Sequence, residues 1–116
     1  MEILGTHMIL EFYGCDPKTL EDRKYVEEAI LEAAQKSNFH SIGSFFHQFK
    51  PFGVSGVVII EESHISIHTW PEHRYAAIDF FYCSEEVDPE AGIEVLKQKF
   101  KPERVSVTTL YRGVIE

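Results

Sequence analysis

The chain has 116 residues, of which 44% are hydrophobic, so we expect a single compact domain with an apolar core. Its formal net charge of −8, without any Lys/Arg cluster, argues against binding to nucleic acid, whose phosphates would be repelled. No apolar run approaches the roughly 20 residues of a membrane span and no leader-like segment opens the chain. We therefore expect a soluble, cytoplasmic protein that binds no membrane.

The first predicted elements are a strand and a helix. Residues 4–12 are β-prone, and Asp16-Pro17 is typical of a helix start, with Asp as the N-cap and Pro in the first turn. Ser37 and Asn38 are predicted to end this helix. The apolar positions that recur at helical spacing between these signals are Val26, Ala29, Ile30, Ala33 and Ala34.

Four strands are predicted next. Residues 39–49 and 54–60 are separated by a Pro-Phe-Gly turn at 51–53, and the continuous VVII of the second strand indicates burial on both faces. In residues 63–69, polar and apolar side chains alternate, as in a strand with one wet face. The segment 75–82, YAAIDFFY, is the fourth strand of this series.

The last predicted elements repeat the first pair. Asp88-Pro89 is a second cap-and-proline helix start, Pro102 ends that helix, and residues 104–111 alternate as a closing strand. The apolar face of the helix is predicted to carry Ile93, Leu96 and Phe100.

The element order is β-α-β-β-β-β-α-β, which predicts an α+β fold. We expect a ferredoxin-like sandwich, in which both helices pack on one face of an antiparallel sheet. The other face needs a cover, because a bare apolar sheet face is unusual for a soluble monomer. A second copy of the chain is the simplest cover, and the aromatic content of 13% suits such an interface.

Neither histidine nor cysteine spacing predicts a metal site. His64 and His68 would lie about 13 Å apart along a strand, too far for both to bind one zinc ion. Cys15 and Cys83 lack CxxC spacing and argue against a disulfide framework.

A Ser-His-acid triad of Ser63, His68 and Asp79 can be written down, but Ser63 lacks the G-x-S-x-G elbow that would expose it. The pattern alone favours a plainer interpretation. In that interpretation Glu61, Glu62 and Ser63 form a hairpin turn, and the histidines face solvent.

The segment GVSGVVIIEESHISIHTWPE, followed by YAAIDFFYC, resembles the signature of the small prokaryotic S-adenosylmethionine decarboxylases. These are pyruvoyl enzymes made as self-cleaving proenzymes. FHQFKPFGVSG and LGTHMILEFYGCD are also similar to the family, so the resemblance covers nearly the whole chain. It implies an S-adenosylmethionine decarboxylase that serves spermidine synthesis and works as a homodimer of processed αβ units.

The resemblance implies that the chain breaks between Glu62 and Ser63, giving a β chain of residues 1–62 and an α chain of residues 63–116. A hydroxyl in this position can attack the preceding carbonyl to form an ester, and loss of the Ser63 α-proton then eliminates the Glu62 carboxylate. The cofactor expected is the pyruvoyl group left at Ser63, with neither metal nor pyridoxal phosphate. It would condense with the substrate amine as a Schiff base and accept electrons as CO₂ leaves.

The resemblance assigns the base for this elimination to His68, and assistance in processing to Ser55 in the facing strand. Imidazole suits proton transfer near neutral pH. Ser63 and His68 have opposite parity in a strand, so we expect the chain to leave regular strand geometry near Ser63.

Cys83 is implied as the acid that reprotonates the product carbanion, in an apolar setting that keeps the thiol protonated. Phe49, Trp70 and Phe12 are at positions where the family stacks adenine, and Glu72 is placed to accept the ribose hydroxyls. Aromatic faces also attract a sulfonium cation.

Departures from the family pattern are His73 and Arg74 before Tyr75, and Ser84 after Cys83. Two alternative functions stay open. One is a pyruvoyl-dependent arginine or ornithine decarboxylase, because the pyruvoyl step does not depend on the part of the substrate beyond its α-amino and carboxyl groups. The other is a non-enzymatic dimeric ligand-binding module.

Overall fold

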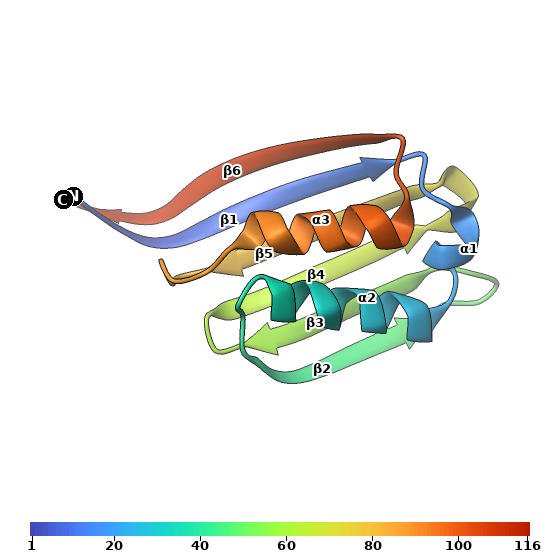
Figure 1. Ribbon diagram of the computed structural model, residues 1–116, viewed down its shortest axis with the longest axis horizontal. Helices are drawn as coiled ribbons and strands as arrows, with labels where there is room; N and C mark the ends of the chain where they lie inside the picture. Colours follow the sequence, from blue (N-terminus) through green and yellow to red (C-terminus); the bar gives the residue numbers. More distant parts are fainter.

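The computed structural model describes residues 1–116 as one six-stranded antiparallel sheet with its helices on one face (Figure 1). The sheet order is β2-β3-β4-β5-β1-β6. The strands are β1 (Glu2–Tyr13), β2 (Ser41–Gln48), β3 (Val54–Ile60), β4 (Ser63–Trp70), β5 (Tyr75–Tyr82) and β6 (Arg104–Ile115). The helices are α1 (Pro17–Leu20), α2 (Arg23–Lys36), α3 (Pro89–Phe100) and the 3-10 turn η1 (Pro71–His73).

The predicted α+β class, with two main helices on one face of the sheet, is confirmed. The chain has two strand–helix–strand halves, β1–α2–β2 and β5–α3–β6, and the β3–β4 hairpin lies between them. β2 and β6 are the edges of the sheet, and β4 is an inner strand paired with β3 and β5.

The helix starts follow the predicted chemistry with one correction. Asp16 caps only the four-residue α1, and a second cap, Asp22, begins α2 by accepting hydrogen bonds from the N–H groups of Lys24 and Tyr25. The one long helix predicted after Asp16-Pro17 is therefore two. Asp88 caps α3 as expected, by accepting from the Ala91 N–H.

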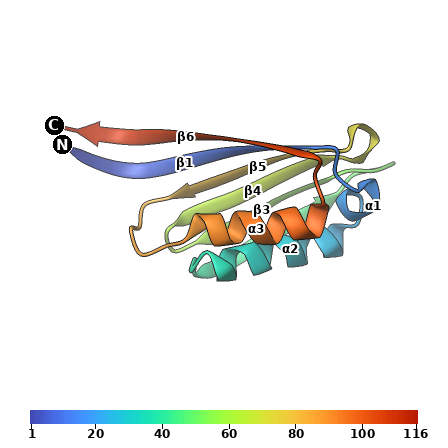
Figure 2. The ribbon, with the colours of Figure 1, turned by 45° about the horizontal axis from the view of Figure 1, so that its top comes forward.

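One face of the sheet is covered and the other is bare. Figure 2 shows α2 and α3 side by side beneath the sheet, with nothing above it. The side chains of Leu10, Ile67 and Phe80 point into the covered layer and are fully buried.

This asymmetry corrects the expectation for β3. Val58 and Ile60 face the helices and are buried, whereas Ile59 is 47% exposed on the bare face. β3 is therefore buried on one face only, because a single chain supplies one layer of helices. No helix of the fold has the length and apolarity needed to cross a bilayer.

Candidate active site

The turn between β3 and β4 places Ser63 in an unusual backbone conformation. Ile60 and Ser63 pair across the turn, and Glu61 and Glu62 form its tip. Ser63 has φ +154°, a region that residues other than glycine rarely adopt. The predicted departure from strand geometry is thus present at Ser63 itself.

The carbonyl oxygen of Glu62, which belongs to the predicted scissile peptide, accepts two hydrogen bonds from one residue. The Cys83 N–H lies 3.1 Å from it, and the Cys83 Sγ also donates to it at 3.1 Å. Two donors on one carbonyl oxygen polarise it and stabilise negative charge on it. The end of β5 brings Cys83 here because Ser63 pairs with Tyr82.

The side chain of Glu62 is held separately by His40. His40 Nδ1 lies 2.8 Å from Glu62 Oε2, and the His40 N–H donates to Glu62 Oε1 at 3.0 Å. The hydrogen bond to Glu62 and its negative charge raise the pKa of His40. Partial burial works to raise the pKa of Glu62, but the hydrogen bonds from His40 outweigh it and lower that pKa.

His40 was missed by reasoning from the sequence. A single histidine 22 positions before Glu62 carries no local signal. Only the pairing of β2 with β3 brings the two residues together.

His68 and Ser55 form a second constellation. They pair directly across β3 and β4, and Ser55 Oγ lies 2.7 Å from His68 Nδ1. Both line a cavity of about 300 Å³ whose wall also includes three predicted substrate-binding residues, Phe49, Trp70 and Glu72. The structure therefore gathers five of the predicted site residues around one cavity.

The two constellations lie at opposite ends of β4. Ser63 is its first residue, and His68 is five residues later, which is about 17 Å along a strand. In Figure 1 the β3–β4 turn and the β4–β5 connection are at opposite ends of the sheet. Within one chain, His68 does not reach Ser63.

The triad of Ser63, His68 and Asp79 is not assembled. Asp79 instead accepts from Ser66 Oγ at 3.1 Å and contacts His7 Nε2 at 2.9 Å. That row of polar groups crosses the middle of the bare face.

Two further expectations are corrected. Phe12 is fully buried in the core, because its side chain faces the helices, and it cannot stack on a ligand. Cys83 is exposed rather than enclosed by apolar groups, since β5 ends at Tyr82 and the thiol lies beyond the covered layer.

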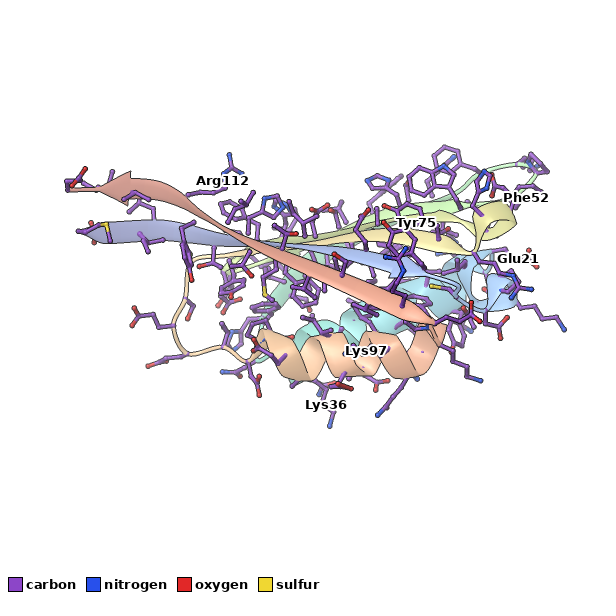
Figure 3. The ribbon with its side chains drawn as sticks, turned by 90° about the horizontal axis from the view of Figure 1, so that it is seen from above. Glu21, Lys36, Phe52, Tyr75, Lys97 and Arg112 are labelled. Carbon is purple, nitrogen blue, oxygen red and sulfur yellow. The ribbon has the colours of Figure 1, made fainter.

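The bare face carries a polar and aromatic network at the end of the sheet where β4 connects to β5. Tyr75 Oη donates to the Glu11 carboxylate at 2.6 Å, and Tyr13 Oη donates to the same carboxylate at 3.2 Å. The ring centroids of Trp70 and Tyr75 are 5.4 Å apart. Burial first, and then the hydrogen bond to Glu11, raises the pKa of Tyr75. In Figure 3, Tyr75 and Arg112 project from the side of the sheet opposite Lys36 and Lys97 of the helical layer.

Sequence comparisons agree on one family. The family profile described as S-adenosylmethionine decarboxylase matches residues 6–113. The S-adenosylmethionine decarboxylase proenzyme of Pyrococcus abyssi is 46% identical over all 116 residues, which cover 84% of that protein. The proenzyme of Thermotoga petrophila is 49% identical over 113 residues, or 97% of this chain and 87% of that protein.

Comparison with solved structures gives the same fold. The crystal structure of adenosylmethionine decarboxylase from Aquifex aeolicus VF5 superposes with a TM-score of 0.92 at 32% identity, covering 100% of this chain and 96% of that one. The Trypanosoma brucei AdoMetDC-delta26 monomer superposes with a TM-score of 0.68 at 21% identity, covering 90% of this chain and 45% of that one. At 21% identity, the second match shows only that the two proteins share a fold.

Proposed function

The chain belongs to the S-adenosylmethionine decarboxylase family. We propose that it is a self-cleaving proenzyme and that the processed enzyme releases CO₂ from S-adenosylmethionine. Decarboxylated S-adenosylmethionine is the aminopropyl donor for spermidine biosynthesis. The observation that carries the proposal is the carbonyl of Glu62, held by two donors of Cys83 next to a strained Ser63.

Self-cleavage would begin at that carbonyl. Ser63 Oγ attacks the Glu62 carbon, the peptide C–N bond breaks as the nitrogen takes the hydroxyl proton, and an ester remains. The Cys83 donors lie where negative charge develops on the Glu62 oxygen. Relief of the φ +154° conformation at Ser63 favours the same step.

A base then removes the Ser63 α-proton, and the Cβ–Oγ bond of Ser63 breaks. The oxygen leaves with Glu62 as its new α-carboxylate. The dehydroalanine at position 63 hydrolyses with loss of ammonia, which leaves a β chain of residues 1–62 and a pyruvoyl-bearing α chain of residues 63–116. His68 is the proposed base and Ser55, hydrogen-bonded to it, the residue that orients its ring. The pyruvoyl group supplies an electron sink for decarboxylation.

Because His68 lies about 17 Å along β4 from Ser63, the site needs His68 from another copy of the chain. Two sheets packed through their bare faces, about a two-fold axis that runs across the strands, would set Ser63 of one subunit opposite His68 of the partner subunit. Large apolar side chains exposed on this face support the packing: Phe45 is 70% exposed and Ile59 47%. The proposed unit is therefore a homodimer of αβ units with two identical sites.

The substrate would lie in the cavity of Phe49, Trp70 and Glu72. Aromatic faces stack on adenine and attract the fixed sulfonium charge. The Glu72 carboxylate accepts hydrogen bonds from both ribose hydroxyls. At the other half of the site, the Cys83 thiol is released from the Glu62 carbonyl by cleavage and becomes available to protonate the product carbanion.

Intact-mass measurement and CO₂ release test this function together. The purified wild-type chain is expected to give fragments of 62 and 54 residues, the second lacking a free amino terminus. It is expected to release CO₂ from S-adenosylmethionine and not from arginine or ornithine, with Ser63→Ala as the uncleaved, inactive control. Release from arginine or ornithine alone would overturn the substrate, and an intact, inactive wild-type chain would favour a non-enzymatic binding module.

A further inference from the structure

His40 makes three polar contacts with the turn that contains the scissile bond. Its N–H and its Nδ1 bind the two carboxylate oxygens of Glu62 at 3.0 and 2.8 Å. Its own carbonyl oxygen accepts the Glu61 N–H at 2.8 Å. The Glu62 side chain is only 11% exposed, whereas the His40 ring is 61% exposed.

Glu62 is therefore held at both ends. His40 fixes the carboxylate, and Cys83 fixes the backbone carbonyl that Ser63 must attack. Attack on a carbonyl requires the reacting atoms to be aligned, and a displacement of about 1 Å can cost about a hundredfold in rate. A free Glu62 side chain would let the turn rotate and move its carbonyl away from Cys83.

We propose that His40 is a positioning residue for self-cleavage, which holds Glu62 so that its carbonyl stays on the Cys83 donors during attack by Ser63. The inference rests on the proposed function, since it concerns the same Glu62–Ser63 bond. His40 touches neither the reacting carbon nor Ser63 Oγ in this role. It acts through the Glu62 side chain.

The attraction between a protonated His40 and the Glu62 carboxylate strengthens their contact, called the ionic clamp below, before cleavage. It also has an effect after cleavage. Glu61 and Glu62 are the charged groups that face His40. Breaking the bond adds the new α-carboxylate of Glu62, so the cleaved turn brings three carboxylates together around one imidazole. A protonated His40 offsets their repulsion and keeps the end of the β chain in place.

The ionic clamp has a defined pH range. Glu62 raises the pKa of His40, so the ring stays charged below that raised value and loses its charge as pH rises through it. Cleavage of the wild-type chain should therefore fall as pH rises through the raised His40 pKa and the ring loses its charge.

The test follows cleavage of full-length chains after a short pulse of cell-free synthesis, with gel and mass readouts between pH 5.5 and about 9, a range that brackets the ordinary histidine pKa. We expect His40→Ala to slow cleavage about ten- to a hundredfold at pH 7. His40→Gln keeps a side-chain donor without the charge, so it should recover much of the rate and lose the fall at high pH. Lys36→Ala removes an exposed positive charge at the end of α2 that makes no contact with Glu62, so this control should cleave at the wild-type rate.

Folding is controlled in chains that cannot cleave. Ser63→Ala and the double variant His40→Ala/Ser63→Ala should have similar circular dichroism and the same oligomeric state, so a misfolded double variant would mark His40 as structural and overturn the proposal. Wild-type cleavage in His40→Ala, with an unchanged pH profile, would also overturn it. Arrest of wild-type cleavage by a chelator would do the same, because His40, Glu61 and Glu62 would then be ligands of a cation. If the wild-type chain itself fails to cleave, the proposed function fails instead.

Discussion

Ser63 and His68 belong to the same strand, yet they lie at opposite ends of it. Ser63 pairs with Ile60 and Tyr82 beside the β3–β4 turn, whereas His68 pairs with Ser55 and Ala77 near the far cavity. Under the proposed mechanism, one chain therefore carries two half-sites, one with the scissile Ser63 and one with the base His68, and a complete site needs one of each from two subunits.

Mixed dimers should show that the two half-sites come from different subunits. Ser63→Ala cannot cleave but supplies His68, and His68→Ala supplies an intact Ser63. When differently tagged chains are co-expressed, we expect the His68→Ala chain to be cleaved and the Ser63→Ala chain to stay whole. Gels probed for each tag measure this.

Each variant expressed alone is the control. His68→Ala alone is expected to stop at the ester, which keeps the mass of the chain but is split by hydroxylamine. If His68→Ala remains uncleaved in the mixture as well, the subunits do not share a site.

Removing the Cys83 thiol should slow self-cleavage and stop turnover. Cys83→Ala keeps the backbone N–H on the Glu62 carbonyl and loses the Sγ donor. One lost donor to a developing oxyanion predicts cleavage slower by about tenfold or more. Cys83→Ser restores a donor, so it should cleave faster than Cys83→Ala while remaining inactive on S-adenosylmethionine. Equal cleavage rates for all three chains would contradict a role of the thiol in processing.

The two thiols should differ sharply in reactivity. Burial raises the pKa of Cys15 to about 12, whereas Cys83 is exposed. In Ser63→Ala at pH 8, a colorimetric thiol reagent should therefore modify one cysteine per folded chain and two after denaturation. The folded state keeps Cys15 protonated, so its contribution to stability is present below the unfolded thiol pKa of about 8.5 and is lost as pH rises toward 12. Modification of both thiols at equal rates in the folded chain would refute the burial of Cys15.

Glu72→Gln should separate substrate binding from processing. Glu72 lines the cavity and is remote from the Glu62–Ser63 bond of its own chain. An amide accepts hydrogen bonds from two ribose hydroxyls less well than a carboxylate, so we expect KM to rise about ten- to a hundredfold. The extent of self-cleavage should be unchanged, and a cleavage defect would place Glu72 in processing instead.

Thr69→Val should destabilise the fold without changing its surface. Thr69 is buried, accepts the Val54 N–H at 2.9 Å, and donates to the Leu20 carbonyl at 2.8 Å. Valine leaves both backbone groups without a partner, which predicts a loss of about 2 to 3 kcal/mol in the free energy of unfolding. Urea unfolding in the Ser63→Ala background measures it, with the exposed Thr109→Val as control. Equal losses in both variants would contradict the reason given.

Reasoning from the sequence was most successful where structure is set by neighbours along the chain. Alternation over 63–69 located β4, and Asp88-Pro89 located the start of α3, because periodicity and capping act within a few residues. The same reasoning put Glu62 and Ser63 at a hairpin turn. It expected the departure from strand geometry at Ser63 to bring His68 to that residue, and this was wrong, because the two residues lie at opposite ends of β4 in spite of the unusual φ of Ser63. It missed the break between α1 and α2, because Asp16 and Asp22 are both good caps and only packing determines which one starts the long helix.

What the tertiary structure alone decided is which distant residues meet. Strand pairing brings His40 to Glu62 and Cys83 to the Glu62 carbonyl, and no local signal predicts either contact. The side of the sheet that the helices cover decided that Phe12 is core and that Ile59 faces outward. Local hydrogen bonds and periodicity fix each element by itself, whereas long-range pairing and the burial of one sheet face fix how the elements combine.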